Sequence, residues 1–402
     1  MFDKLQNISF RFVFRFLMVV KPPPAPRVFE GVDASLELCR SVVAGGAKSV
    51  LLITTAGMVK RATVDPLLKT LQEAGATVHI FDEVEPNPLV STVEAGIKRY
   101  EAANADAVLA FGGGSVLDAA KAVALGAANA RPLRQLIGFF KAKQKAVPFY
   151  AIPTTAGSGS EITSAALLTD DTSHQKLFLL DHKLIPLAVA LDPEPMATMP
   201  AGITAETGAD ALTHAIEAYV TPIRPPELMR TAASAIKQIF DHLPEAFQHG
   251  ENRTARGHLA RASFDAGRAF NAMGLGFVHA LSHQLTAHYG VPHGRTNAVL
   301  LPAVLQASRH GIAPALATLA HQLWPEDAPA ATDLAATFFI ERVQSLMRAL
   351  EMPSAVPEIK ERDLDAIIRA ARKEAIGSYP VAYLLSTAEC RDILLKVKNG
   401  ES

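Results

Sequence analysis

The chain has 402 residues, more than one ordinary hydrophobic core holds, so two domains are expected. Its 39 Lys and Arg against 40 Asp and Glu leave a formal net charge of −1, which disfavours nucleic acid as a partner and favours a small molecule. With 49% hydrophobic and 20% charged residues, the chain is not a disordered sequence. The two cysteines, Cys39 and Cys390, are too few for a disulfide framework or a thiolate metal site and favour a reducing cytoplasm.

The first 27 residues read as an N-terminal extension. Its longest uninterrupted apolar run, residues 16–20, is too short for a signal peptide or a membrane span, so no integral membrane segment is expected. Phenylalanines at alternate positions from Phe10 to Phe16 suit a strand, whereas Arg11 and Arg15 would share a helical face. We favour a cap or a strand swapped onto a partner subunit over a peripheral membrane anchor, because amphipathic anchors usually carry more basic charge.

Residues 28–200 alternate apolar strings with helical patterns. The strings are "SVLLIT" (49–54), "TVHIF" (77–81), "AVLAF" (107–111), "PFYAI" (148–152) and "LAVAL" (187–191). Near-continuous apolar runs are typical of strands covered on both faces, so the pattern predicts an α/β domain with a parallel sheet and crossover helices. One of these helices, 91–103, is expected to open with a capping box made by Ser91 and Glu94. From residue 201 to 402, Ala-rich and Leu-rich helical periodicity predicts an all-helical domain.

Two polar loops follow predicted strands of the first domain. "AFGGGSVLDAAK" (110–121) would let a pyrophosphate approach the backbone at a helix N-terminus, although a glycine turn at a strand end is often only a turn. "IPTTAGSGSEIT" (152–163) offers hydroxyls and amides, or alternatively a helix cap through Ser160. Two such loops at the carboxyl edge of one sheet favour a dinucleotide site.

Histidines gather in "VHALSHQLTAHYGVPHG" (278–294). His279 and His283 lie one helical turn apart, as do Asp210 and His214 in "ETGADALTHAIEAY", and His293 follows in a predicted turn. One carboxylate and three imidazoles suit a divalent cation with a position left for an exogenous ligand. The alternatives are ordinary surface or core histidines, an interpretation we keep for His288, and an Asp210 that only favours a helix dipole near a helix start.

These motifs together resemble the iron-containing (group III) alcohol dehydrogenase family, collinearly from about Val28 to the C-terminus and most strongly between residues 107 and 303. The resemblance implies a Rossmann-like N-terminal α/β domain and an all-α C-terminal domain, the dehydroquinate synthase-like fold. It also implies NAD or NADP as cofactor and a divalent metal, Fe²⁺ by family and Zn²⁺ as the alternative.

Carried over by position, the resemblance assigns roles to individual residues. It makes Asp210, His214, His279 and His293 the metal ligands, and Gly113, Gly114, Ser115, Asp118, Thr154, Thr155, Ser158 and Thr163 the dinucleotide contacts. His283 falls beside the substrate, where we expect it to transfer a proton or orient the hydroxyl, and Phe270 lines the substrate cleft.

The chain departs from the family pattern at two cofactor positions. Ser158 replaces a common threonine and keeps its hydroxyl. Thr55 stands where many members have an aspartate that accepts a hydrogen bond from the adenosine ribose and repels a 2′-phosphate. Because Lys60 and Arg61 follow closely, the sequence leaves NAD and NADP open.

The predicted function is a metal-dependent alcohol dehydrogenase that transfers hydride between a small alcohol, aldehyde or ketone and NAD(P). We expect a cytoplasmic homodimer or higher homo-oligomer. Glycerol dehydrogenase, maleylacetate reductase and dehydroquinate synthase share the fold, but "DALTH" and "VPHG" favour the alcohol dehydrogenase branch. A protein of another class, an inert binding or filament-forming scaffold that has lost turnover, is the remaining alternative.

Overall fold

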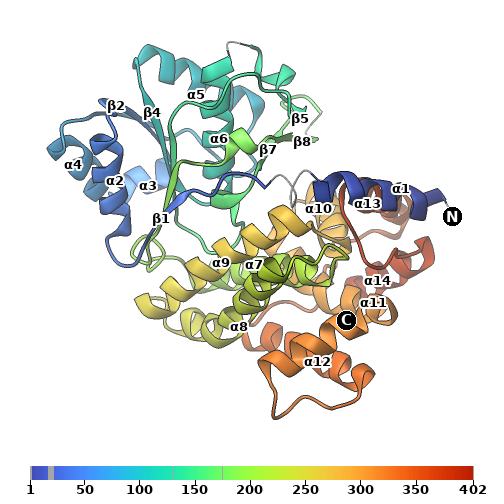
Figure 1. Cartoon of the computed structure of the whole chain (residues 1–402). Helices are drawn as coiled ribbons and strands as arrows, with labels where there is room; N and C mark the ends of the chain where they lie inside the picture. Colours follow the sequence, from blue (N-terminus) through green and yellow to red (C-terminus); the bar gives the residue numbers. More distant parts are fainter. Residues whose placement is uncertain (1, 17–21, 130, 174, 402) are drawn as a thin grey trace. The chain divides into compact units, whose positions relative to one another are not determined.

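A computed structural model describes residues 2–16, 22–129, 131–173 and 175–401 (Figure 1). The chain divides into two compact units. The α/β unit comprises residues 23–199 and 250–264, and the helical unit comprises residues 1–22, 200–249 and 265–402.

The α/β unit is built on a six-stranded parallel sheet, which confirms the predicted fold class. Its strands, in the spatial order β1-β9-β6-β4-β2-β3, are β1 (Arg27–Glu30), β9 (Ala188–Leu191), β6 (Phe149–Pro153), β4 (Ala107–Gly112), β2 (Ser49–Ile53) and β3 (Thr77–Phe81). Strand β4 is buried along its whole length, as expected for a parallel strand with helices on both sides.

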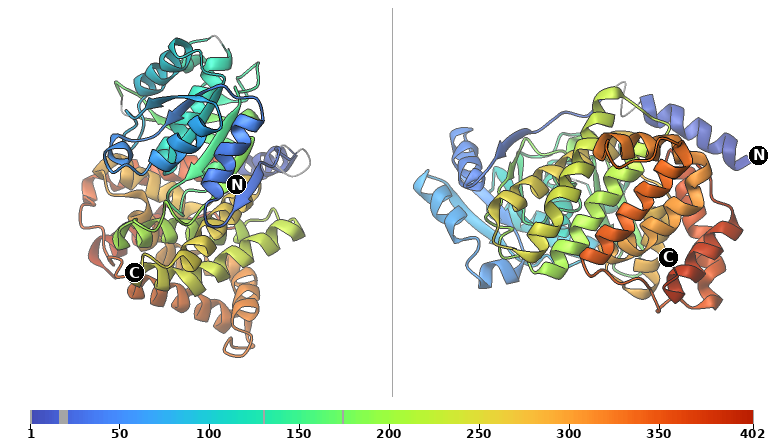
Figure 2. Two further views of the ribbon diagram at one scale, coloured as in Figure 1. Left: turned by 90° about the vertical axis from the view of Figure 1, so that its left-hand side faces the viewer. Right: turned by 90° about the horizontal axis from the view of Figure 1, so that it is seen from below.

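Helices flank both faces of this sheet (Figures 1 and 2). They are α2 (Ala34–Ala44), α3 (Ala56–Lys60), α4 (Asp65–Glu73), α5 (Val90–Ala102) and α6 (Gly114–Asn129). Helices α2 and α4 share one apolar core with alternate residues of the strands, while α5 packs on α6. The predicted capping box is wrong: α5 begins at Val90 after Leu89 as N-cap, so Ser91 lies inside the helix, and its amide donates to Asp171 Oδ1 at 3.2 Å.

A second, three-stranded sheet was not predicted. Its strands, in the order β5-β8-β7, are β5 (Gly138–Phe139), β8 (Lys176–Leu180) and β7 (Ala165–Thr169), and the unit also contains short 3-10 turns η2 (Leu133–Gln135), η3 (Ser160–Ile162) and η4 (His182–Leu184). Strands β7 and β8 are antiparallel. Each strand carries a short apolar run, but Leu167 and Phe178 are exposed, so these strands are not covered on both faces as those of the main sheet are.

The helical unit is all-α, as predicted. Its helices are α1 (Phe2–Arg15), α7 (Ala201–Val220), α8 (Pro226–Gln248), the last part of α9 (Arg253–Met273), α10 (Phe277–Tyr289), α11 (His293–Leu323), α12 (Thr332–Ala349), α13 (Leu364–Ser378) and α14 (Thr387–Asn399), with the 3-10 turn η5 (Glu361–Asp363). Helices α10 and α11 pack together, and α11 also packs on α7. Gly294 permits the second contact, because a Cβ there would lie 2.3 Å from the backbone oxygen of Glu206 in α7.

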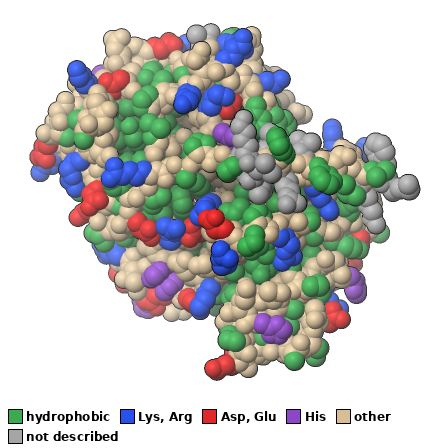
Figure 3. Space-filling view, in the orientation of Figure 1, with side chains coloured by type: hydrophobic (Ala, Val, Ile, Leu, Met, Phe, Trp, Pro, Cys, Tyr) green, Lys and Arg blue, Asp and Glu red, His purple; other side chains and the backbone are tan. Residues whose placement is uncertain are grey.

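Residues 2–15 of the N-terminal extension form a helix rather than the strand suggested by the alternating phenylalanines. Helix α1 packs along α13 (Figure 1) and its Asn7 is fully buried. Of the apolar run 16–20, residues 17–20 lie outside the described part of the chain. Among the helices that the structure describes, none is long and apolar enough to cross a membrane. On the face drawn in Figure 3, basic and acidic side chains are interspersed, in keeping with the net charge of −1.

Candidate functional site

Helix α7 supplies a carboxylate and an imidazole from successive turns. The Nε2 atom of His214 lies 3.8 Å from Oδ1 of Asp210, and both side chains are nearly buried. Asp210 stands in the middle of α7, which begins at Ala201. Since the helix dipole acts only on the first turn, the alternative that Asp210 merely stabilises a helix start is wrong.

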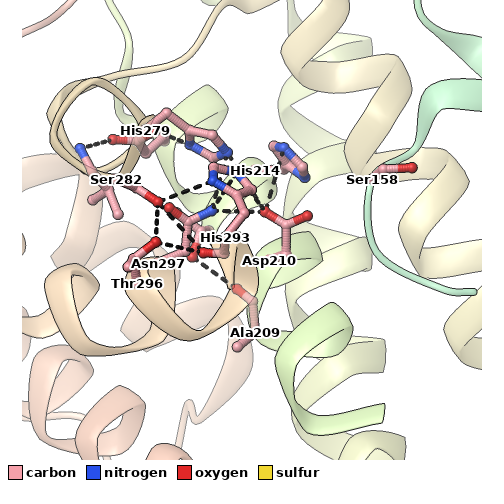
Figure 4. Close-up of polar contacts among 12 residues, drawn as sticks. Ser158, Ala209, Asp210, His214, His279, Ser282, His293, Thr296 and Asn297 are labelled. Atoms are coloured by element: carbon pink, nitrogen blue, oxygen red, sulfur yellow. Dashed lines mark hydrogen bonds and ion pairs between the residues drawn. The ribbon is translucent and has the colours of Figure 1, made fainter. Parts of the chain in front are cut away.

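Helices α10 and α11 bring two further imidazoles to the same carboxylate (Figure 4). The Nε2 atoms of His279 and His293 lie 3.7 Å and 3.5 Å from Oδ1 of Asp210. One ligand atom from each of these three residues lies within 4.8 Å of the others. His293 does not lie in a turn, as the sequence suggested, but is the first residue of α11, after Pro292 as N-cap.

The spacing of these atoms fits a small divalent cation. Ligands about 2.1 Å from a tetrahedral metal lie about 3.4 Å from one another. The distances from Asp210 Oδ1 to the Nε2 atoms of the three histidines, 3.5 to 3.8 Å, are close to that separation. The donor set of one carboxylate and imidazoles is one that both iron and zinc accept.

Glu217, which the sequence reasoning missed, orients His279. Its Oε2 lies 2.7 Å from Nδ1 of His279, and its two oxygens accept the backbone amides of Gly276 and Val278 at 2.9 Å and 2.7 Å. A Cβ at Gly276 would lie 2.6 Å from Glu217 Oε1, so only glycine admits this carboxylate. A carboxylate on Nδ1 leaves Nε2 of His279 directed at the ligand cluster, the arrangement common for metal-bound histidines. Glu217 follows His214 by three residues on α7, which was the one available signal.

Polar side chains also surround His293. Ser282 Oγ lies 3.0 Å from Nδ1 of His293, which directs Nε2 at Asp210. The amide nitrogen of Asn297 donates to Asp210 Oδ1 at 2.7 Å and lies 3.1 Å from His293 Nε2 and 3.3 Å from His279 Nε2 (Figure 4). The candidate ligand atoms of Asp210, His279 and His293 therefore surround the positive end of an amide dipole, at the place that a cation would occupy. The buried Oδ1 of Asn297 finds no hydrogen-bond partner among the described residues.

The cluster is electrostatically suited to a cation. Burial would raise the pKa of Asp210, but His214, His293 and His279 together hold it well below its ordinary value, so the carboxylate stays ionised. Burial lowers the pKa of His279, but Asp210 and Glu217 outweigh this effect and raise it to about 9, because the two carboxylates favour a positive charge at this point, whether a proton or a metal ion. Burial, assisted by the neighbouring histidines, lowers the pKa of His293 well below its ordinary value and keeps its imidazole neutral, the form that binds metal.

His283 lies beside the cluster and is held by a different carboxylate. Its Nδ1 is 2.6 Å from Glu374 Oε1, and its ring stacks on that of His293 with centroids 5.1 Å apart. Tyr379 Oη donates to the same Glu374 oxygen at 2.6 Å. Glu374 and Tyr379 were both missed from the sequence. Burial would raise the pKa of Glu374, but His283, Tyr379 and Gln284 lower it, so this carboxylate is an anion facing His283.

The sequence also suggested Phe270 as a residue lining the substrate cleft and His288 as an ordinary histidine. The ring of Phe270 stacks on that of His214, with centroids 4.3 Å apart. His288 is exposed, and its Nδ1 lies 3.1 Å from the backbone oxygen of Gln284 within the same helix, which agrees with its interpretation as an ordinary surface histidine.

In the α/β unit, the two polar loops meet at the carboxyl ends of β4 and β6. The amide of Thr154 donates to Gly112 O at 3.0 Å. A Cβ at Gly113 would lie 3.3 Å from Thr155 Oγ1, and one at Gly114 would lie 2.9 Å from Ser158 Oγ. Gly114 and Ser115 are the first residues of α6, whose N-terminal amides can bind an anion.

Some polar side chains of these loops have no hydrogen-bond partner in the described part of the chain, whereas others bond to neighbouring loop residues. Thr154 Oγ1 is buried and has no hydrogen-bond partner among the described residues, which leaves it available to a ligand. Asp118 instead accepts Ser160 Oγ at 2.6 Å and the amide of Leu167 at 3.0 Å. Ser160 therefore braces Asp118 and is not a helix cap, since η3 has Gly159 at its N-cap.

Lys121 of α6, a residue that the sequence reasoning missed, holds the end of the second loop in place. Its fully buried ammonium donates to Thr163 Oγ1 at 2.9 Å, to Thr163 O at 3.0 Å and to Ala165 O at 2.7 Å. Burial lowers the pKa of Lys121 to about 8, against the opposing effect of Asp118 and Glu161.

Thr55 follows β2 at the same edge of the sheet. It is the N-cap of α3, and its Oγ1 accepts the amide of Met58 at 3.3 Å. A single antiparallel bridge pairs Thr55 with Glu83, just after β3, so the backbone places a carboxylate-bearing residue beside it.

Comparisons with known proteins agree for both halves of the chain. Residues 24–193 match the model of the iron-containing alcohol dehydrogenases, and residues 204–388 match that of the C-terminal domain of Fe-containing alcohol dehydrogenases. Alcohol dehydrogenase 4 of Schizosaccharomyces pombe is 36% identical over 87% of this chain and 82% of its own. The NAD-dependent methanol dehydrogenase of Bacillus methanolicus is 36% identical over 87% of this chain and 92% of its own. A crystal structure of 1,3-propanediol oxidoreductase superimposes with a TM-score of 0.89 at 33% identity, covering 93% of this chain and 99% of that one.

Proposed function

The chain belongs to the iron-containing alcohol dehydrogenase family, oxidoreductases that act on CH–OH groups, and we propose that it interconverts small primary alcohols or diols and their aldehydes with NAD as the hydride acceptor. The observation that carries this proposal is the convergence of Asp210, His279 and His293, with His214 beside them, on one point of the helical unit. The names of two similar proteins, a methanol dehydrogenase and 1,3-propanediol oxidoreductase, support the class of substrate.

When bound, the divalent metal supplies a Lewis acid for the substrate oxygen, and the nicotinamide supplies the hydride acceptor. Asp210, His214, His279 and His293 hold the metal in this proposal, with Glu217 keeping the Nε2 atom of His279 directed at it. The Nε2 atoms of the three histidines, which face Asp210 Oδ1, and the ionised Asp210 suit that role.

His283 is the proposed proton-transfer group. With Nδ1 engaged by Glu374, its Nε2 is the atom that accepts the hydroxyl proton during oxidation and returns it during reduction. The ionised Glu374 stabilises the imidazolium that forms in oxidation and keeps the ring in one orientation. Phe270, stacked on His214, restricts the movement of that ring and lines the substrate space in this proposal.

For the dinucleotide, the proposed contacts are residues of the two loops at the carboxyl edge of the sheet. Gly113, Gly114 and Ser115 present the N-terminus of α6 to the pyrophosphate. Thr154, Thr155 and Ser158 offer hydroxyls, and the unpaired Thr154 Oγ1 supports this assignment. Asp118 and Thr163 contribute to the same site by bracing the loops through Ser160 and Lys121.

The choice between NAD and NADP depends on the edge of the sheet near Thr55. Thr55 itself is neutral, but Glu83 lies beside it in the backbone pairing, and a carboxylate there disfavours a 2′-phosphate. We therefore propose NAD as the preferred cofactor. A homo-oligomer and a cytoplasmic location complete the proposal. The cytoplasmic location is supported by the two cysteines, which are both buried as free thiols.

A screen of primary alcohols, diols and aldehydes with both cofactors tests this function. We expect alcohol-dependent reduction of NAD⁺ with a higher kcat/KM than for NADP⁺. A preference for glycerol or for maleylacetate would place the protein with other oxidoreductases of this fold. Complete absence of cofactor turnover in metal-loaded protein would instead favour the inert scaffold.

The cofactor loop gives a separate prediction. Gly114→Val should raise the dissociation constant for NAD by at least about tenfold, because the new side chain meets Ser158 and blocks the approach of the pyrophosphate. Isothermal titration calorimetry measures this constant, and metal content should not change. Gly257→Ala is the matched control, since its Cβ would meet no atom within 4 Å. Unchanged NAD binding in Gly114→Val would remove this loop from the cofactor site.

A further inference from the structure

We propose that Asn7, in the N-terminal helix α1, is a positioning residue that fixes His283 through Tyr379 and Glu374. This inference rests on the proposed function, because it gives His283 the substrate proton. Helix α1 precedes the region that matches the family, which begins at residue 24. The proposal therefore concerns a feature of this chain's own extension.

Asn7 binds the chain where α13 ends. Its Nδ2 donates to Ile376 O at 3.1 Å and to Tyr379 O at 2.7 Å, and the side chain is fully buried. Carbonyls in the last turn of a helix have no partner within that helix, so an outside donor fixes both the helix end and the residue that follows. Arg11 Nε donates to Asn7 Oδ1 at 2.8 Å and holds the amide in this orientation.

Tyr379 connects this contact to the site. Its backbone oxygen accepts from Asn7, while its Oη donates to Glu374 Oε1 at 2.6 Å. The same Oε1 lies 2.6 Å from Nδ1 of His283. Three short hydrogen bonds thus link a buried amide of α1 to the imidazole that we assign to proton transfer.

Further contacts hold α1 to the same segment. Arg11 donates to Val381 O, and Arg372 of α13 donates to Asp3 Oδ2 at 2.8 Å and to Leu385 O. The backbone oxygens of Tyr379 and Val381 are therefore held from α1, and that of Leu385 by Arg372, which also binds Asp3 of α1. Gln284 Nε2, which donates to Glu374 Oε2 at 3.1 Å, holds the carboxylate from the opposite side of the network.

The test is a double-mutant cycle on the metal-loaded, full-length enzyme. Asn7→Ala should lower kcat about three- to tenfold, the rate equivalent of one net hydrogen bond, with KM, metal content and NAD affinity unchanged. In a His283→Ala background the same substitution should lower kcat no further, since the group it positions is gone. Ser9→Ala, at an exposed position of the same helix, is the control and should leave kcat unchanged.

Tyr379→Phe removes only the phenolic oxygen and keeps the backbone contact to Asn7, so it tests the link if Asn7→Ala folds poorly. It should lower kcat in the same way and likewise have no effect in the His283→Ala background. An equal loss of kcat from Asn7→Ala or Tyr379→Phe in both backgrounds would overturn the inference, as would wild-type kcat in both variants. Wild-type kcat in His283→Ala alone would instead overturn the proton-transfer role in the proposed function.

Discussion

Replacing His279 with alanine should abolish alcohol oxidation and remove the metal. The substitution deletes one of the three donors that converge with Asp210 and leaves Glu217 buried without its imidazole partner. His293→Ala should have the same effect for the same reason. Metal content of the purified variants, measured by elemental analysis, should fall from about one ion per chain to near zero, the expected consequence of losing a ligand from a tetrahedral site.

Two controls separate loss of metal from loss of fold. His288→Ala changes an exposed histidine of the same helix and should keep both metal and turnover. Glu217→Gln should weaken metal binding about ten- to hundredfold without deleting a ligand. Calorimetric NAD binding to the α/β unit should survive in every variant. Full metal stoichiometry in both His279→Ala and His293→Ala would show that the assigned ligand set is wrong.

His283→Ala should keep its metal and bind NAD but lose about a hundredfold to ten-thousandfold in kcat, the range typical of a positioned proton-transfer group. Its Nδ1 faces Glu374, not the ligand cluster, which is why metal content should not change. Single-turnover kinetics with deuterated alcohol would show whether the loss falls on the hydride-transfer step. Loss of metal would make His283 a ligand, and unchanged kinetics would make it a packed residue.

The parts of the fold that could be predicted are those with a local signal. Strand β4 is buried along its whole length, so its sequence is a continuous apolar string. Asp210 and His214 lie one turn apart on α7, as their spacing in the sequence predicts. Strands β7 and β8 were missed because each carries only a short apolar run, Ala165–Leu168 and Leu177–Leu180, and a run that short does not distinguish a strand from a piece of helix or loop. The phenylalanines of α1 suggested a strand, but the helix is fixed by contacts of Asn7 with residues near 376.

The two carboxylates missed at the site have histidine partners that are distant in sequence. Glu217 binds His279 across 62 positions, and Glu374 binds His283 across 91. A single sequence shows which residues can ligate a metal from their type and spacing, but such carboxylates become visible only when the packing of α7, α10 and α13 is known. The anchoring of Lys121 at Thr163 is of the same kind.

The claim that alcohol oxidation depends on a metal ion in this cluster is tested most directly by removing the metal and adding it back. The enzyme is stripped with a chelator, dialysed and assayed for alcohol-dependent reduction of NAD⁺ before and after addition of Fe²⁺ or Zn²⁺. If Asp210, His214, His279 and His293 hold the catalytic ion, the stripped protein is inactive, and activity returns in proportion to bound metal up to about one ion per chain. Full alcohol oxidation by the metal-free protein would contradict the account.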